Sequence, residues 1–390
     1  MSRQRLANVS LLLAVLLLCA ASVELAARLW TRRTPAVRSE EPLHRHDPEL
    51  GWVKVPGAVA RLEREEFSIT IEVNANGQRG PLRPFEKPAG VSRVLLLGDS
   101  FAAGYYVEEP QSVRAMLERR LTSCRPDRVE VLTAGTVGYS TDQEYLEFVG
   151  RSRRYSADVV ILLFFSNDLF FNAQAIGMAA QPKPLFDVRN GELALVDTPA
   201  VAKVAGPPRA PRPWRGSMAL RFLSRRTARG NPKLHRVLEG FGLVAPLPRD
   251  PPREYLVYGP PRFTEQVEPM WRVTEALLER LAAAAAAERA RFGILYVPAR
   301  FETSDAAWAA TSERYNMGSR WRRGAVIERL EVITGRLGIP LIDPTRALGE
   351  VEKRGGSAYY AIDGHWNASG HATAAEALAP FVARQLGCDL

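Results

Sequence analysis

The chain of 390 residues contains only three cysteines, with no C-x-x-C motif and no cluster of cysteine and histidine, so a structural zinc site is not expected. The stretch from Gly98 to Gly104 lacks the G-x-G-x-x-G spacing, which argues against a dinucleotide site. The sequence therefore predicts neither a metal nor another cofactor. Aromatic residues, 8% of the chain, are not interleaved with basic residues at a spacing that would stack bases, so nucleic acid is not an expected partner.

Acidic residues are scarce in one region. Between Val201 and Arg253 the chain has 12 Lys or Arg against 2 Asp or Glu, whereas the net charge of the whole chain is +9. The same stretch has 9 prolines, a density that argues against a regular core. We expect either a cap over the functional site that touches anionic lipid or an acidic polysaccharide, or a solvated loop whose arginines reflect codon usage.

One long apolar run is present. Leu6 to Val23 has 18 residues without a charge and follows two arginines, which just reaches the length needed to cross a bilayer. It is interpreted as a signal anchor, or alternatively as a signal peptide cleaved near Ala21. The first interpretation predicts a single-pass protein of the inner membrane with a periplasmic domain, and the second a secreted protein. Residues 1–28 are assigned to this segment, and 29–41 to a polar linker.

Residues 42–90 are predicted to form a small β-rich preamble. Phe67 to Val73 alternates between apolar and polar residues, as a half-buried strand does. Asn74 to Gly80 has the composition of a turn. Trp52 is expected to lie in the core.

The main domain, 91–390, alternates short apolar runs with helical patterns, which predicts a parallel sheet with right-handed crossovers. Uninterrupted apolar runs are typical of strands that are buried on both faces. The predicted strands are Val94–Leu97, Val129–Leu132, Asp158–Phe164, Phe292–Val297 and Ile339–Asp343. The predicted helices are Gln111–Thr122, Thr141–Arg151, Glu268–Arg289, Arg323–Leu337 and Gly370–Leu386, together with two short ones, Ser217–Ser224 and Leu234–Phe241, inside an insertion at about 173–261.

The cysteines outside the leader follow the first and the last of the main-domain helices. In a doubly wound sheet these two helices can pack side by side, so a disulfide between Cys124 and Cys388 is geometrically possible if the domain is exported. The alternative is two unrelated free thiols.

Polar residues follow several of the predicted strands, at the edge where ligands bind in open α/β sheets. Ser100 follows the first strand within Gly98-Asp-Ser, and Asn167 follows the third. His365, two residues after Asp363, precedes the last helix and should reach the same edge. A serine hydroxyl needs a base within hydrogen-bond reach, and that base needs a group to fix its tautomer. Ser100, His365 and Asp363 are therefore the predicted nucleophile, base and orienting acid.

Four blocks carry these residues in order: GDS at 98–100, TAGTVGYST from Thr133, FFSND ending at Asp168, and DGHWN from Asp363. Together they resemble the SGNH/GDSL hydrolase superfamily, and in particular its membrane-anchored branch of carbohydrate O-acetylesterases and O-acetyltransferases. The resemblance implies a flavodoxin-like, three-layer α/β fold. It also implies an oxyanion hole formed by the Ser100 amide, the Gly138 amide and the Asn167 side chain, with Gly135 as the alternative glycine.

The chain departs from the pattern of this superfamily at three substituted positions and in the spacing of Asp363 and His365, which are two rather than three residues apart, as in acetyltransferase relatives with a D-x-H-W motif. Phe101 replaces a leucine, Thr133 replaces an asparagine and should loosen its turn, and Phe165 replaces a glycine and should narrow the pocket. Asp168 is expected to hold a loop, and His371 to be structural. No partner is evident for His44, His46 or His235.

The predicted function is that of an extracytoplasmic serine esterase or O-acyltransferase. It would act on acyl esters, acetyl foremost, of carbohydrate through an acyl-enzyme. A lipase or thioesterase is one alternative, and a non-catalytic, membrane-anchored scaffold in polysaccharide assembly is another.

Overall fold

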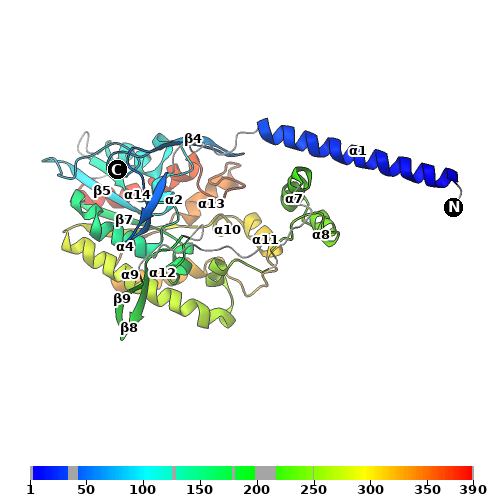
Figure 1. Ribbon diagram of the computed structural model, residues 1–390. Coiled ribbons are helices and arrows are strands. Elements are labelled where there is room, and N and C mark those ends of the chain that lie inside the picture. The colour runs from blue at the N-terminus through cyan, green and yellow to red at the C-terminus, as the bar shows by residue number, and fades with distance from the viewer. Residues whose placement is uncertain are drawn as a thin grey trace. The chain divides into compact units, whose positions relative to one another are not determined.

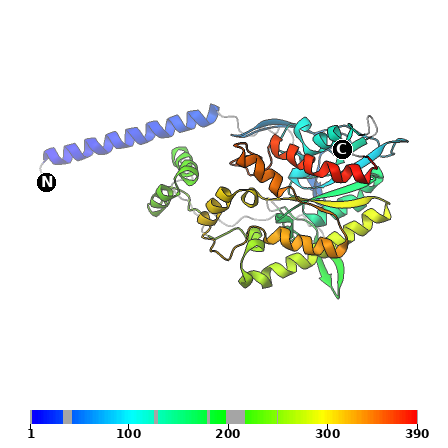
Figure 2. The same ribbon diagram turned by 180° about the vertical axis from the view of Figure 1, so that it is seen from behind.

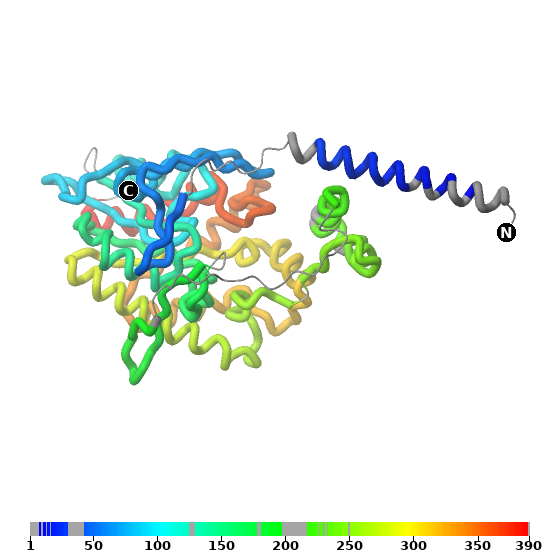
Figure 3. Tube along the Cα trace, viewed as in Figure 1, coloured from blue at the N-terminus to red at the C-terminus, as the bar shows by residue number. Residues whose placement is uncertain are grey.

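The computed structural model describes residues 3–33, 43–124, 129–177, 181–197, 217–248 and 250–388, which Figure 3 traces. The chain divides into two compact units. One consists of Met1–Ala36 with Val204–Arg249, and the other of Val37–Lys203 with Asp250–Leu390.

The larger unit is built on a parallel sheet of five strands in the order β11-β10-β7-β5-β6. All five predicted runs form its strands, which confirms the expected α/β fold. The strands are β5 (Ser92–Gly98), β6 (Val129–Thr133), β7 (Val159–Phe165), β10 (Arg291–Val297) and β11 (Leu341–Ile342). Numbered along the chain, this is the 2-1-3-4-5 order of flavodoxin-like folds. The order reverses between β5 and β7, and ligands bind at such a point in open sheets.

Helices cover both faces of the sheet (Figures 1 and 2). One layer contains α4 (Thr141–Gly150), α9 (Thr264–Ala287) and α12 (Ala325–Leu337), and the other contains α3 (Val113–Leu121) and α14 (Ala368–Gln385). The side chains of β5 alternate between the layers because successive residues of a strand point to opposite faces. Leu95 and Leu97 pack in the first layer, and Val94 and Leu96 in the second. All four are fully buried, and burial of each stabilises the fold by about 1.5–3 kcal/mol.

Short helices connect these layers. They are α2 (Ser100–Ala103), α5 (Asn167–Phe171), α10 (Arg300–Thr303), α11 (Asp305–Arg314) and α13 (Thr345–Lys353), with 3₁₀ turns η1 (Glu109–Gln111), η2 (Ser152–Tyr155), η4 (Arg253–Tyr258) and η5 (Pro261–Phe263). Gly338 ends α12 in the left-handed conformation with φ +65°, and the Asn367 side chain caps α14. Helix α9 begins at Thr264, earlier than predicted, so Pro269 lies inside the helix rather than in its first turn.

The preamble is β-rich, as predicted. It contains two antiparallel hairpins, β1 (His44–Asp47) with β2 (Gly51–Lys54), and β3 (Val59–Glu63) with β4 (Ser68–Glu72). The second hairpin buries its own cluster of apolar side chains, among them Ile69 and Ile71.

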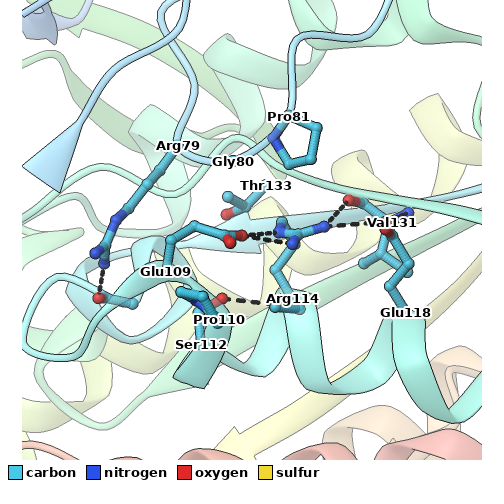
Figure 4. Close-up of polar contacts among 12 residues, drawn as sticks. Arg79, Gly80, Pro81, Glu109, Pro110, Ser112, Arg114, Glu118, Val131 and Thr133 are labelled. Carbon is cyan, nitrogen blue, oxygen red and sulfur yellow. Dashed lines mark hydrogen bonds and ion pairs between the residues drawn. The ribbon is translucent and has the colours of Figure 1, made fainter.

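Two buried arginines tie this preamble and α3 to the loop that follows Ser100 (Figure 4). The Arg79 guanidinium donates to the carbonyl of Gly104, to that of Val107 at 2.7 Å and to that of Thr70 at 3.2 Å. Arg114 pairs with Glu109 and with Glu118, whose carboxylate is 2.9 Å away. Arg79 and Arg114 are each 4% exposed. Removal of either would therefore leave several buried polar groups without partners.

The insertion contains more regular structure than the two short helices predicted for it. It contains an antiparallel hairpin, β8 (Leu185–Arg189) with β9 (Glu192–Asp197), which the sequence analysis missed. The hairpin packs on α9 through Phe186, which lies against Val273 and Leu277.

The smaller unit is helical. It contains α1 (Arg3–Arg33), α7 (Met218–Gly230) and α8 (Pro232–Gly240), the last two being longer than the predicted short helices. The Glu24 carboxylate of α1 accepts hydrogen bonds from the amides of Met218 and Ala219, both at 3.0 Å, at the start of α7. These hydrogen bonds lower the pKa of Glu24 to about 2.

The predicted leader and cap both fall largely in the smaller unit. Helix α1 runs past residue 28 to Arg33, and the rest of the expected linker lies outside the described residues. Counting only the residues that the structure describes, we find no helix that is both long and apolar enough to cross a membrane. Much of the basic stretch 201–253 lies outside them as well, so its contact with anionic lipid or polysaccharide stays a prediction.

Cys124 and Cys388 are joined by a disulfide, with Cα atoms 5.9 Å apart. They follow α3 and α14, which pack side by side. Cys19 is free and exposed.

Candidate active site

Ser100 lies at the turn where β5 passes into α2. The turn depends on Gly98, whose φ is +148° and where a Cβ atom would lie 2.8 Å from the Cβ of Ala102. Only glycine fits this position. The Asp99 carboxylate accepts a hydrogen bond from the Phe101 amide at 2.9 Å and so caps the short helix. The Ser100 hydroxyl is thereby held at the carboxyl edge of the sheet, with the residue 5% exposed.

His365 and Asp363 lie beside Ser100, as the sequence predicts. The Ser100 Oγ atom is 2.8 Å from Nε2 of His365, and Nδ1 of His365 is 2.5 Å from Oδ1 of Asp363. A carboxylate on Nδ1 favours the tautomer in which Nε2 accepts the serine proton. Three residues from two distant parts of the sequence are thus joined by one continuous series of hydrogen bonds.

The loop that carries His365 is fixed on both sides. Within the loop, the Tyr360 amide donates to the His365 carbonyl at 2.8 Å. From the preamble, the Glu66 carboxylate accepts the amides of Ile362 and Asp363, each at 2.9 Å. Glu66 could not be predicted from the sequence, because nothing near it in the chain indicates a partner almost 300 residues away.

Aromatic rings surround the His365 imidazole. The Tyr106 ring centroid is 3.9 Å from that of His365, and the Phe101 centroid is 4.8 Å from it. The Phe165 ring in turn packs on Phe101 at 5.1 Å. Two of the departures from the superfamily pattern, Phe101 and Phe165, therefore lie in contact with each other next to the reactive pair.

The predicted oxyanion donors lie at the same edge of the sheet. Asn167 begins α5 directly after β7, which is the neighbour of β5, and the structure records no hydrogen bond from its side-chain Nδ2, the donor atom, to any described residue. Gly138 follows β6 and has φ +76°, a conformation that favours glycine. The structure records no hydrogen bond from its amide to any described residue. Each of these groups is thus available to a ligand.

Gly135, the alternative glycine, is already engaged. Its amide donates to the Thr133 hydroxyl at 3.2 Å, and that hydroxyl donates to the Ala102 carbonyl at 2.9 Å. A Cβ atom at Gly135 would lie 2.5 Å from the amide nitrogen of Ala103. Thr133 therefore ties this turn to α2, whereas the sequence analysis expected it to loosen the turn.

Buried carboxyl groups lie close to Asp99, the residue before the nucleophile, and the sequence did not reveal this cluster. Asp99, Glu144 and Asp168 are each at most 2% exposed, and burial raises the pKa of each, that of Asp99 to about 6. Neither carboxyl oxygen of Glu144 has a partner among the described residues, which favours its neutral form. Asp168 accepts the Phe165 amide at 3.1 Å and so holds the loop, as expected.

Lys183, from the insertion, supplies a buried positive charge close to these acids. Its ammonium pairs with Asp142 and donates to the carbonyls of Phe171 at 3.0 Å and Pro184 at 3.1 Å. Burial lowers the pKa of Lys183 and raises that of Asp142, so desolvation outweighs the attraction between them.

The remaining histidines lie outside the serine-histidine-aspartate chain. His371 is buried and accepts the Val113 amide on Nδ1 at 3.2 Å, and burial lowers its pKa to about 3. His235 has two partners that the sequence analysis did not identify, the Thr227 hydroxyl and the Ala245 carbonyl, both at 2.8 Å. The buried Nε2 of His44 has no hydrogen-bond partner among the described residues.

A serine hydroxyl that is hydrogen-bonded to an imidazole, itself held by a carboxylate, is the arrangement of serine hydrolases. Here it stands at the carboxyl edge of a flavodoxin-like sheet. The sequence profile of the GDSL-like lipase/acylhydrolase family matches residues 96–317, more than half of the chain, and the chain belongs to this family. The matched range contains Ser100, Gly138 and Asn167 but ends before Asp363 and His365.

Similar solved structures include the lipase/acylhydrolase from Enterococcus faecalis, at 13% identity over 77% of this chain and 98% of that chain, with a TM-score of 0.40. They also include a catalytic mutant of Axe2, an acetylxylan esterase from Geobacillus stearothermophilus, at 13% identity over 77% of this chain and 97% of that chain, with a TM-score of 0.36. No curated protein sequence matches the chain. The family expected from the four motifs is therefore confirmed, while membership of its membrane-anchored branch stays a prediction.

Proposed function

We propose that this protein is an extracytoplasmic serine esterase that removes short acyl groups, acetyl foremost, from carbohydrate. The observation that carries the proposal is the hydrogen-bonded chain from Ser100 Oγ through His365 to Asp363. In the first step the serine oxygen attacks the ester carbonyl while Nε2 of His365 takes its proton. The imidazolium then gives that proton to the departing sugar hydroxyl, which leaves an acyl-enzyme.

Water completes the cycle in the second step. His365 takes a proton from the water as its oxygen attacks the acyl carbonyl, and the released serine oxygen then recovers the proton. In both steps the carbonyl oxygen becomes negative, and the amides of Ser100 and Gly138 with the Asn167 side chain are the donors proposed to stabilise it. A sugar hydroxyl in place of the water would make the same enzyme an O-acyltransferase.

The aromatic residues around the site support a short acyl group and a sugar. Phe165 packs on Phe101 next to the Ser100–His365 pair, with ring centroids 5.1 Å apart, and we expect it to narrow the pocket for the acyl chain. Tyr105, Tyr106 and Tyr360 are half-buried, and of these Tyr106 packs against the His365 ring. Such rings offer flat faces against which the apolar face of a pyranose can stack.

The acyl specificity can be measured with the full-length chain on p-nitrophenyl acetate, butyrate and octanoate. We expect kcat/KM to fall at least about 10-fold from acetate to octanoate, because each misplaced methylene at a closed pocket costs roughly 1 kcal/mol or more. We also expect the enzyme to release acetate from a peracetylated sugar. A preference for octanoate would instead favour a lipase or thioesterase, and turnover of the sugar ester only when an acceptor sugar is added would favour the transferase.

Location outside the cytoplasm is supported by the disulfide, because such bonds persist mainly in oxidising compartments. We expect the chain isolated from its own cells in the presence of iodoacetamide to be labelled at Cys19, and at Cys124 and Cys388 only after reduction. The measurement is mass spectrometry of the alkylated peptides. Alkylation of Cys124 and Cys388 without reduction, in a chain found in the cytosolic fraction, would contradict this location.

A further inference from the structure

The indole of Trp52 holds one peptide group of the loop between β6 and α4. Its Nε1 donates to the Val137 carbonyl at 2.9 Å, although the two residues are 85 positions apart in the chain. Trp52 lies on β2 in the preamble and is 7% exposed. The sequence analysis assigned it to the core and gave it no further role.

The bonded peptide group is the one that carries the Gly138 amide. A peptide group is planar, rigid and trans. The carbonyl of Val137 and the N–H of Gly138 therefore lie in one plane and point in opposite directions. A hydrogen bond that fixes the carbonyl therefore also fixes the direction of the N–H. Gly138 is buried, and the structure records no partner for its amide among the described residues, although nearly all buried amides are paired. This amide is available to an acceptor from outside the chain.

Two further hydrogen bonds join strand β2 to the same loop. The Lys54 ammonium donates to the Gly135 carbonyl at 2.5 Å, and the Tyr139 hydroxyl donates to the Trp52 carbonyl at 2.6 Å. The rings of Trp52 and Tyr139 pack edge to face with centroids 5.7 Å apart. On the other side, a Cβ atom at Gly177 would lie 2.7 Å from the Trp52 ring, so the indole has little freedom to turn.

We propose that Trp52 is a positioning residue for the oxyanion hole. Its hydrogen bond to the Val137 carbonyl fixes the orientation of the Val137–Gly138 peptide group and thereby the direction of the Gly138 N–H. This inference rests on the proposed function, because Gly138 acts as a donor only if Ser100 attacks an ester. Trp52 itself touches neither the substrate nor the reacting atoms. Its indole replaces the water that would otherwise bind the Val137 carbonyl and let the peptide group turn. The donor is thus held in place before the reaction begins.

The test is Trp52→Phe in the full-length chain, which keeps a ring in the core and removes the N–H. We expect kcat for p-nitrophenyl acetate to fall about 10-fold, less than the 10²- to 10³-fold typical of deleting an oxyanion donor, because the amide is misdirected rather than lost. KM should stay within about 2-fold. Inhibition by a boronic acid, whose tetrahedral adduct on Ser100 places an oxygen in the hole, should weaken by a factor similar to the loss in kcat.

Trp321→Phe is the matched control, because Trp321 is also 7% exposed but has no side-chain hydrogen bond in the described structure. It should be destabilised to a similar extent and keep its kcat and its affinity for the boronic acid. If Trp52→Phe does not fold, Tyr139→Phe takes its place. Tyr139→Phe removes the hydroxyl that holds Trp52, and we expect the same pattern from it.

The outcomes separate this inference from the proposed function. Unchanged kcat and boronic acid affinity in Trp52→Phe, in an enzyme that depends on Ser100, would overturn the role of Trp52 alone. Equal losses of kcat in Trp52→Phe and Trp321→Phe would show a purely structural effect and would also overturn it. Full activity of Ser100→Ala would instead overturn the proposed function.

Discussion

Ser100→Ala is expected to lower kcat/KM for p-nitrophenyl acetate by about 10³-fold or more, while the protein stays folded. The loss should be large because no other described side chain offers His365 Nε2 a hydroxyl at hydrogen-bond distance. The fold should tolerate the change because alanine removes only one oxygen from the short helix α2. The measurements are steady-state hydrolysis and thermal unfolding of the full-length chain.

Asp363→Asn tests the carboxylate that orients His365. The asparagine keeps the size of the side chain but no longer favours the tautomer in which Nε2 accepts a proton. We therefore expect kcat to fall about 10²- to 10⁴-fold. Ser123→Ala, at an exposed serine whose hydroxyl bonds only to the Arg120 carbonyl, is the control and should keep full activity. A Ser100→Ala protein as active as Ser123→Ala would show that Ser100 is not the nucleophile.

Lys183→Met is expected to cause the largest loss of stability, about 3–5 kcal/mol in the free energy of unfolding near pH 8. The substitution leaves the Asp142 carboxylate, which is 0% exposed, buried without its counterion. It also removes the donor to the carbonyls of Phe171 and Pro184. Urea unfolding of the full-length chain measures the loss.

The loss should depend on pH in a defined direction. Burial already raises the pKa of Asp142 above its usual 3.8, and removal of the ammonium should raise it further. A carboxyl whose folded pKa is raised contributes stability that is complete below its unfolded pKa and is lost as the pH rises through the folded pKa. The variant should therefore lie closest to the wild type in acid and furthest from it above neutral pH.

Two further variants test whether the uncompensated buried charge causes this loss of stability. A second substitution, Asp142→Asn, should restore part of the stability because it removes the uncompensated charge. Lys87→Met breaks a partly exposed ion pair with Asp158 and should cost less than about 1 kcal/mol. An equal loss in the free energy of unfolding for Lys87→Met and Lys183→Met would mean that burial of the Lys183–Asp142 pair does not account for its contribution to stability.

The sheet could be predicted because four of its five strands are buried along most of their length. Each of the five strands of the sheet is a short, mostly apolar run of sequence, and the helices between them show a different period. The hairpin β8–β9 was missed because it packs on α9 through few side chains, mainly Phe186, and is otherwise half exposed. Its strands therefore lack the continuous apolar run that marks the strands of the central sheet.

Three features could be predicted from the sequence alone: the order of elements, the strand ends that carry Ser100 and Asn167, and the short spacing that lets Asp363 orient His365. These features are local, because they depend on residues a few positions apart. Three other contacts became visible only in the folded protein: Glu66 holds the His365 loop, Lys183 pairs with Asp142, and Trp52 bonds to the peptide group of Gly138. Such contacts join residues from about 40 to 300 positions apart. They form when separate elements pack together, and no periodicity or spacing along the chain records which side chains will meet.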